Sequence, residues 1–277
     1  MPRSKSLTVI TPSHSGRRSL LADLLEYREL IYALVSRDLR VRYKQTVIGA
    51  AWAVVQPLAL MVVITVFFGY LGRFPSDGIP YPIFAYCALL PWLLFARSLF
   101  SGSTSVVANG ALVQKIYFPR VILPGVVIAS GLVDFAVALV ALFVLMAYYG
   151  MTLTVAVFLA PVFVLLAVAT ALGVSLFFAA LDVRYRDVRH LLPLVTQVWM
   201  FASPIIYPAS VVPEAFRPFY GLNPMVGVIE GFRWTLLPGA PPPDWSMLAV
   251  STCAIVALLV GGYSYFSRAE PTFADRL

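Results

Sequence analysis

The residues best suited to chemistry in this sequence are four cations that lie directly before a long uncharged stretch: Arg37, Arg40, Arg42 and Lys44. No further charge follows until Arg73. The planar guanidinium of arginine binds phosphate oxygens bidentately, and a low-dielectric headgroup region strengthens such a pair. The cluster therefore predicts either a dedicated phosphate-binding site or a set of orienting charges that pair with anionic lipid at about 1 kcal/mol per residue. Residue type and spacing alone leave both interpretations open.

Two further charges, Arg97 and Asp134, interrupt apolar stretches of the chain. Because each costs about 2.5–3.5 kcal/mol at membrane depth on insertion scales, we expect both to face protein or water rather than lipid. Our hypothesis is a salt bridge between them or to a second copy of the chain. A proton- or sodium-coupled carrier would need more ionisable groups at this depth, and it would usually carry internal repeats, of which we find no clear case.

The sequence offers little for an enzyme. It contains no G-x-x-x-x-G-K-[ST] string, so if ATP drives this protein, a separate subunit binds the ATP and its Mg. Asp182 and Asp187 leave one remote alternative open, an intramembrane prenyl-phosphate transferase that holds magnesium pyrophosphate on paired aspartates. The neighbouring Arg184, Arg186 and Arg189 favour internal ion pairs instead, and a second acidic motif is missing.

Composition indicates the kind of protein that must position these residues. The chain is 60% hydrophobic and 12% charged, whereas a soluble domain is about half apolar and roughly a quarter charged. The net charge of +7 is local, because nine of the twenty basic residues precede residue 46, and it does not predict a nucleic-acid partner. Cys87 and Cys253 lie in apolar runs, which predicts small buried hydrophobes and no disulfide or metal site.

Apolar runs of roughly 20 residues predict an all-α membrane protein with six spans. These spans are expected near residues 47–71, 81–106, 121–147, 155–181, 191–207 and 245–266. An amphipathic interface helix is predicted over 27–44, at the start of a single transmembrane domain that covers 27–277. Residues 1–26 read as a flexible cytoplasmic tail, because they lack the sustained apolar core of a signal peptide.

The segment 214–237 breaks the pattern of spans. It is apolar between its charges but too short there to cross a bilayer, which predicts a re-entrant hairpin between spans five and six. Asn223-Pro224 is the expected break between two half-helices. An amphipathic surface loop is the alternative.

Basic residues indicate which side each segment faces. With the N-terminus inside, cytoplasmic segments hold sixteen of the twenty basic residues, while three lie outside and Arg97 lies in a span. We therefore expect both termini to be cytoplasmic.

Four stretches, taken in order, carry a resemblance to a known family. They are "RDLRVRYKQTVIGAAWAVVQP" (37–57), "QKIYFPRVILP" (114–124), "DVRYRDVRHLLPLVTQVWMFASPIIYP" (182–208) and "LNPMVGVIEGFRWTLL" (222–237). The chain resembles the membrane subunits of type-2 ABC exporters, the permeases that export O-antigen, capsular and teichoic acid polysaccharides. The resemblance covers essentially everything after the N-terminal tail.

The resemblance implies a homodimeric permease in the bacterial inner membrane with one ATPase subunit under each half. It implies export of a polysaccharide attached to undecaprenyl pyrophosphate, preferably of the O-antigen type, with no cofactor in this chain. Teichoic acid, or a small lipid or drug, is the alternative substrate. In this frame Arg37, Arg40, Arg42 and Lys44 would meet the carrier's pyrophosphate.

The resemblance also implies that two short cytoplasmic loops touch the ATPase, through Lys115, Arg120, Asp182, Arg186 and Asp187. Aromatic residues make up 14% of the chain, and such rings can stack on sugars. Candidates for a glycan channel wall are Trp52, Trp92, Trp199 and Tyr207. An ordinary aromatic belt at the membrane interface is the simpler explanation for any one of them.

Overall fold

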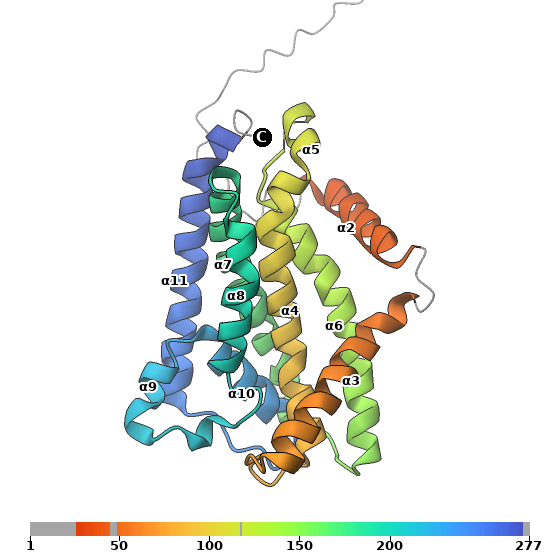
Figure 1. The fold of residues 1–277 in the computed structure, drawn as a ribbon, viewed down its shortest axis with the longest axis vertical. Helices are drawn as coiled ribbons and strands as arrows, with labels where there is room; N and C mark the ends of the chain where they lie inside the picture. The colour runs from red at the N-terminus through yellow and green to blue at the C-terminus, as the bar shows by residue number, and fades with distance from the viewer. Residues whose placement is uncertain (1–25, 45–48, 117, 274–277) are drawn as a thin grey trace, which may run out of the picture.

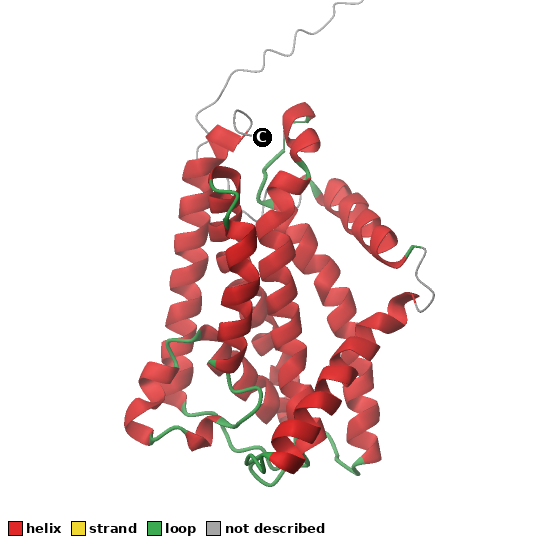
Figure 2. Cartoon of the chain, viewed as in Figure 1, coloured by secondary structure: helices red, strands yellow, loops and turns green. Residues whose placement is uncertain are grey.

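The computed structural model describes residues 26–44, 49–116 and 118–273, and Figure 2 shows helices and loops without strands in these ranges. The helices are α2 (Arg28–Tyr43), α3 (Trp52–Ile64), α4 (Tyr81–Ala108), α5 (Gly110–Lys115), α6 (Ile122–Tyr148), α7 (Ala160–Arg184), α8 (Val188–Phe201), α9 (Arg217–Tyr220), α10 (Pro224–Leu236) and α11 (Trp245–Ala269). The predicted all-α class is therefore confirmed for the described part of the chain. The tail assigned to 1–26 lies almost wholly outside it.

Five segments of the described chain are long and apolar enough to cross a membrane: Trp52–Leu71, Tyr81–Ala108, Ile122–Tyr148, Val155–Arg184 and Trp245–Thr272. The first includes a π-helical continuation of α3, Thr65–Leu71. They correspond to five of the six predicted spans, although residues 47 and 48 of the first lie outside the described ranges. The chain is thus a multi-pass membrane protein.

The predicted fifth span, 191–207, takes a different form. Helix α8 has 14 residues and ends at Phe201, which at 1.5 Å per residue is about 21 Å, short of the roughly 30 Å of a bilayer core. After it the chain bends through residues 202–207, where Pro204 and Pro208 have no N–H to continue a helix. A sixth span therefore stays a prediction.

Helix α4 is the centre of the bundle, and 78% of the residues in its most apolar stretch are buried. It packs against α3, α6, α7, α8 and α10, and Figure 1 shows it running between them. In the most apolar stretches of the segments that contain α3 and α11, only 22% of the residues are buried. Their exposed apolar faces suit contact with lipid or with another protein surface.

Helices α7 and α11 approach closely because two glycines meet. A Cβ on Gly262 would lie 2.0 Å from the carbonyl oxygen of Gly173, and a Cβ on Gly173 would lie 2.7 Å from Leu258. Small residues let backbones pack at such distances in membrane helices. Helices α7 and α11 therefore pack backbone against backbone at this point.

The predicted break at Asn223-Pro224 is a helix boundary. The Asn223 side chain caps α10 by accepting a hydrogen bond from the Met225 amide at 3.0 Å. The other arm of the predicted hairpin is not a half-helix: it consists of a 3-10 turn at Glu214–Phe216 and the four-residue α9. Whether 214–237 re-enters the membrane remains a prediction.

The interface helix α2 lies obliquely beside the bundle and packs on α6 (Figure 1). Leu34 is its one buried residue. Helix α5, the α7–α8 turn and the C-terminal turn Glu270–Thr272 lie at the upper end of the bundle in that view. Of the two free cysteines, Cys87 is buried as expected, but Cys253 is exposed on α11, so its predicted burial is wrong.

Candidate functional site

The cationic helix α2 has two faces, and the charged residues on them have different partners. On the face toward α6, Arg42 Nη2 lies 2.6 Å from Asp38 Oδ2, one helical turn earlier. The Ser130 hydroxyl of α6 donates to the same Asp38 oxygen at 2.6 Å. In the sequence, Asp38 falls on the apolar side of this helix, four residues after Leu34. The structure supplies the reason: Asp38 helps to dock α2 on α6.

Asp134, on α6, collects three donors. Arg42 Nη1 lies 2.6 Å from Asp134 Oδ2, and Arg97 Nη1 of α4 contacts the same oxygen. The Tyr43 hydroxyl donates to the other carboxylate oxygen. The mutual ion pair expected between Arg97 and Asp134 is thus present, and Asp134 ties three helices together.

The cluster balances its own charge, with two guanidinium groups against the carboxylates of Asp38 and Asp134. Burial raises the pKa of the Tyr43 phenol, and its hydrogen bond to Asp134 raises that pKa further. Tyr43 therefore stays a neutral donor at physiological pH.

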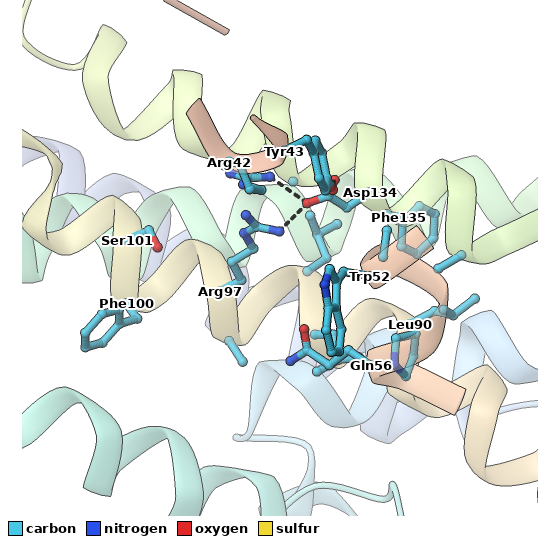
Figure 3. Close-up of a pocket in the computed structure, with 17 residues that line it drawn as sticks. Arg42, Tyr43, Trp52, Gln56, Leu90, Arg97, Phe100, Ser101, Asp134 and Phe135 are labelled. Carbon is cyan, nitrogen blue, oxygen red and sulfur yellow. Dashed lines mark hydrogen bonds and ion pairs between the residues drawn. The ribbon is translucent and has the colours of Figure 1, made fainter. Parts of the chain in front are cut away.

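A cavity of about 510 Å³ opens directly beside this cluster. Figure 3 shows Arg42 and Arg97 converging on Asp134, with Trp52 and Gln56 of α3 along the same cavity. The remaining wall comes mostly from apolar residues of α3, α4 and α6, which include Leu90, Phe100 and Phe135. The arrangement is a largely apolar pocket with a few polar groups at one side, the usual form of a ligand site.

The four candidate phosphate-binding cations have different surroundings. Arg42 is engaged by carboxylates, as described above. Arg37 is exposed and donates from Nη2 to the uncharged Asn109 side chain at 2.7 Å. Arg40 and Lys44 are exposed, and within the described ranges their side chains form no ion pair. Arg37, Arg40 and Lys44 share one helical stripe at i, i+3 and i+7, and this outer stripe carries three exposed cations that have no carboxylate partner among the described residues.

The four candidate aromatic residues are not on one wall. Trp52 is 48% exposed and lines the cavity, whereas Trp92 is buried and packs on Phe95 with ring centroids 5.5 Å apart. The Trp199 indole donates to the Asn223 side chain at 2.7 Å, and the Tyr207 hydroxyl donates to the Phe201 carbonyl at 3.1 Å.

The candidate ATPase contacts divide into exposed and internal groups. Lys115, Arg186 and Asp187 are exposed at the end of the bundle where α5 lies. Asp182 is buried and accepts from Arg189 Nε at 2.9 Å. The Arg120 backbone amide donates to the Glu270 carboxylate at 2.8 Å.

The Asp182–Arg189 pair weighs against the prenyl transferase alternative, which needs Asp182 for magnesium. No group of three or more acidic, histidine or cysteine side chains suited to a metal occurs among the residues that the structure describes.

One buried ion pair was missed by the sequence analysis. In α10, Arg233 Nη1 lies 2.6 Å from Glu230 Oε1, and the two side chains are only 3% and 9% exposed. Arg233 Nη2 donates to the Pro204 carbonyl at 2.9 Å, and the Ala209 amide donates to Glu230 at 3.3 Å. The i, i+3 spacing of opposite charges in an apolar segment was the available signal.

Asn223 is a second residue whose role exceeds the prediction. Beyond capping α10, its Nδ2 donates to the Ala202 carbonyl at 2.9 Å and to the Ser203 hydroxyl at 3.0 Å. With Glu230 and Arg233, it anchors the bend 202–207 and the following turn at Ala209 to α10.

Comparison with known proteins adds to this geometry. A family model described as ABC-2 type transporter matches residues 29–237. The chain is 30% identical to the O-antigen export system permease protein RfbA of Myxococcus xanthus, over 93% of this chain and 99% of that protein. It is 28% identical to a protein of the same name from Klebsiella pneumoniae, over 90% and 95% of the two chains. It is also 24% identical to the polysialic acid transport protein KpsM of Escherichia coli, over 87% and 93%.

Proposed function

The chain belongs to the ABC-2 type transporter family, and from this premise we propose that it is the transmembrane permease subunit of an ATP-driven polysaccharide exporter. Relatives named for O-antigen export and for polysialic acid transport are similar over nearly their full length, which favours a polysaccharide over a small lipid or drug. Export of O-antigen type chains is our preferred function, and teichoic acid export is the alternative.

The substrate in this proposal is attached to undecaprenyl pyrophosphate. The observation that carries the proposal is the division of charge on α2, where Arg42 pairs with Asp38 and Asp134 while Arg37, Arg40 and Lys44 are exposed. A doubly charged pyrophosphate can bind these cations without breaking an internal ion pair. Arg42 then has a positioning role, since it holds α2 against α6 beside the cavity.

The assembly in this proposal is a homodimer with two ATPase subunits in the bacterial inner membrane, with both termini cytoplasmic. Helix α8 and the bend 202–207 together form the sixth crossing, and residues 214–237 re-enter from the outer side. Exposed Lys115, Arg186 and Asp187 meet the ATPase, while Trp52 lines the entry to the glycan path.

The first test is purification of the chain from its native host followed by identification of what accompanies it. We expect a stoichiometric ATPase, and ATP hydrolysis by the reconstituted complex that rises when undecaprenyl-pyrophosphate glycan is added. If the isolated chain moves glycolipid in vesicles without any ATPase, the proposal is wrong. Stimulation by a small amphiphilic drug but not by glycolipid would support the alternative substrate.

The second test compares Arg40→Gln with Arg42→Gln in a cellular export assay. Arg40→Gln should lower export while membrane insertion, thermal stability and ATPase co-purification stay normal. The reason is that Arg40 forms no ion pair within the described ranges, so the substitution breaks none there. Arg42→Gln should lower export together with stability. Normal export by Arg40→Gln and by Arg37→Gln would contradict phosphate binding by this stripe, and it would indicate that these cations only orient the chain during membrane insertion.

A further inference from the structure

A second cavity, of about 350 Å³, lies between α7 and α11 at the end of the bundle near the C-terminal turn. It is separate from the cavity beside Asp134 and shares no lining residue with it. Its principal walls are Val183 and Arg184 of α7, Tyr265 and Arg268 of α11, and the following Thr272 and Phe273.

The two arginines of this groove are both exposed, and within the described ranges neither forms an ion pair. Arg184 lies over the Tyr185 ring at 5.2 Å. The nearby carboxylates are already engaged, Asp182 by Arg189 at 2.9 Å and Glu270 by the Arg120 amide at 2.8 Å. Among the residues that the structure describes, two positive charges therefore face the groove without a carboxylate partner.

Below the arginines, just beyond the residues that line the groove, the surface is apolar, and we call this surface the aromatic floor. Tyr265 packs against Phe177 with ring centroids 5.2 Å apart, and Phe177 is 40% exposed. Phe177 precedes Arg184 by seven residues, which places it about 10 Å further along the helix toward the middle of the bundle. The close contact of Gly173 with Gly262 fixes the separation of α7 and α11.

The two arginines suit the charged headgroup of a phospholipid, and the exposed aromatic floor below them suits its apolar chains. We propose that this groove binds an anionic phospholipid, with its phosphate between Arg184 and Arg268 and an acyl chain along Phe177 and Tyr265. Basic pockets between membrane helices are a recurrent form of such sites. A soluble phosphate would leave the aromatic floor without a ligand, so the lipid is the occupant that uses both parts.

The test measures lipid retention by the full-length chain in nanodiscs, using phosphatidylglycerol, with phosphatidylcholine of the same acyl chains as the neutral comparison. Wild type should retain phosphatidylglycerol preferentially in native mass spectrometry. Each arginine near an anionic headgroup contributes about fivefold in affinity, so the double variant Arg184→Gln/Arg268→Gln should lose about twenty-fivefold. Arg184→Lys/Arg268→Lys should restore most of the affinity.

The matched control is Lys115→Gln/Arg186→Gln, which removes two exposed positive charges from the same end of the bundle but none from the groove. Retention should stay within about twofold of wild type. An equal loss in both double variants would overturn the proposal in favour of general surface charge. Unchanged retention in Arg184→Gln/Arg268→Gln would overturn it directly.

Two competitors distinguish the lipid from other occupants. Millimolar inorganic phosphate should fail to displace phosphatidylglycerol, and displacement would reassign the groove to soluble anions. Bound lipid should also survive addition of the co-purifying ATPase, whereas its loss would identify the groove as a protein-docking surface. Neither result depends on glycan export, so this inference can fail while the proposed function stands.

Discussion

Two arginine–carboxylate clusters interrupt the apolar helices, and they differ in access to solvent. Around Asp134, one carboxylate is shared by Arg42 and Arg97, whose side chains are 20% and 33% exposed beside an open cavity. In α10, Arg233 and Glu230 are 3% and 9% exposed. The Arg233 guanidinium also stacks over the Phe84 ring at 3.6 Å.

The difference separates two uses of the same chemistry. A sealed pair cannot exchange a partner for water, so it is a fixed brace, which in this chain holds the bend 202–207 and the following turn at Ala209 on α10. A cluster open to a cavity can hydrate a group that loses its partner. Its members can therefore lose a partner at a lower free-energy cost than those of the sealed pair.

The largest effect is expected at the sealed pair. Arg233→Gln should lower the free energy of unfolding by about 3–5 kcal/mol, because it leaves the buried Glu230 without its charged partner. Thermal unfolding of the purified chain in mild detergent, followed by tryptophan fluorescence, measures this loss. The double variant Glu230→Gln/Arg233→Met should lose less than the single one, and equal or greater loss in the double variant would contradict a brace that depends on pairing.

A smaller effect is expected at the open cluster. Asp134→Asn should cost about 1.5–3 kcal/mol, the range for hydrogen bonds to charged groups, since water in the cavity can solvate Arg42 and Arg97. The same unfolding assay measures this loss. Export in cells should fall by a larger fraction than the free energy of unfolding does. If Asp134→Asn destabilises the chain as much as Arg233→Gln, the distinction between open and sealed clusters is wrong.

The smallest effects divide the two faces of α2. Arg42→Gln should cost about 1 kcal/mol, the upper end for partly exposed ion pairs, because Asp134 keeps Arg97 as a partner. Arg40→Gln should stay within about 0.5 kcal/mol of wild type, as is usual for exposed positions. A cysteine pair placed across α2 and α6 should crosslink more slowly in Arg42→Gln only. Equal crosslinking rates in the two variants would remove the positioning role of Arg42.

Much of the fold could be predicted from the sequence because hydropathy is a local property. The apolar runs near 81–106, 121–147 and 155–181 became helices within a few residues of their expected ends. The segment 191–207 was harder, since a short helix followed by a proline-containing bend has the same average hydropathy as a span. Only the backbone path distinguishes the two.

The candidate site was predictable in part. Arg97 and Asp134 were expected to pair because isolated charges in apolar runs need partners. The inclusion of Asp38, Tyr43 and Ser130 was not predicted, because these polar residues are unremarkable in sequence. Trp92 shows the opposite failure: its residue type suits a sugar-binding wall, yet packing buries it against Phe95.

By itself, the sequence determined that this chain spans a membrane and concentrates positive charge ahead of its first span, because both properties are sums over neighbouring residues. The tertiary structure alone decided which cation is neutralised. Arg42 and Asp134 are 92 positions apart, and an ion pair requires contact within about 4 Å. The helix packing that supplies that contact leaves Arg40 exposed and directs Arg42, only two residues later, into the cluster.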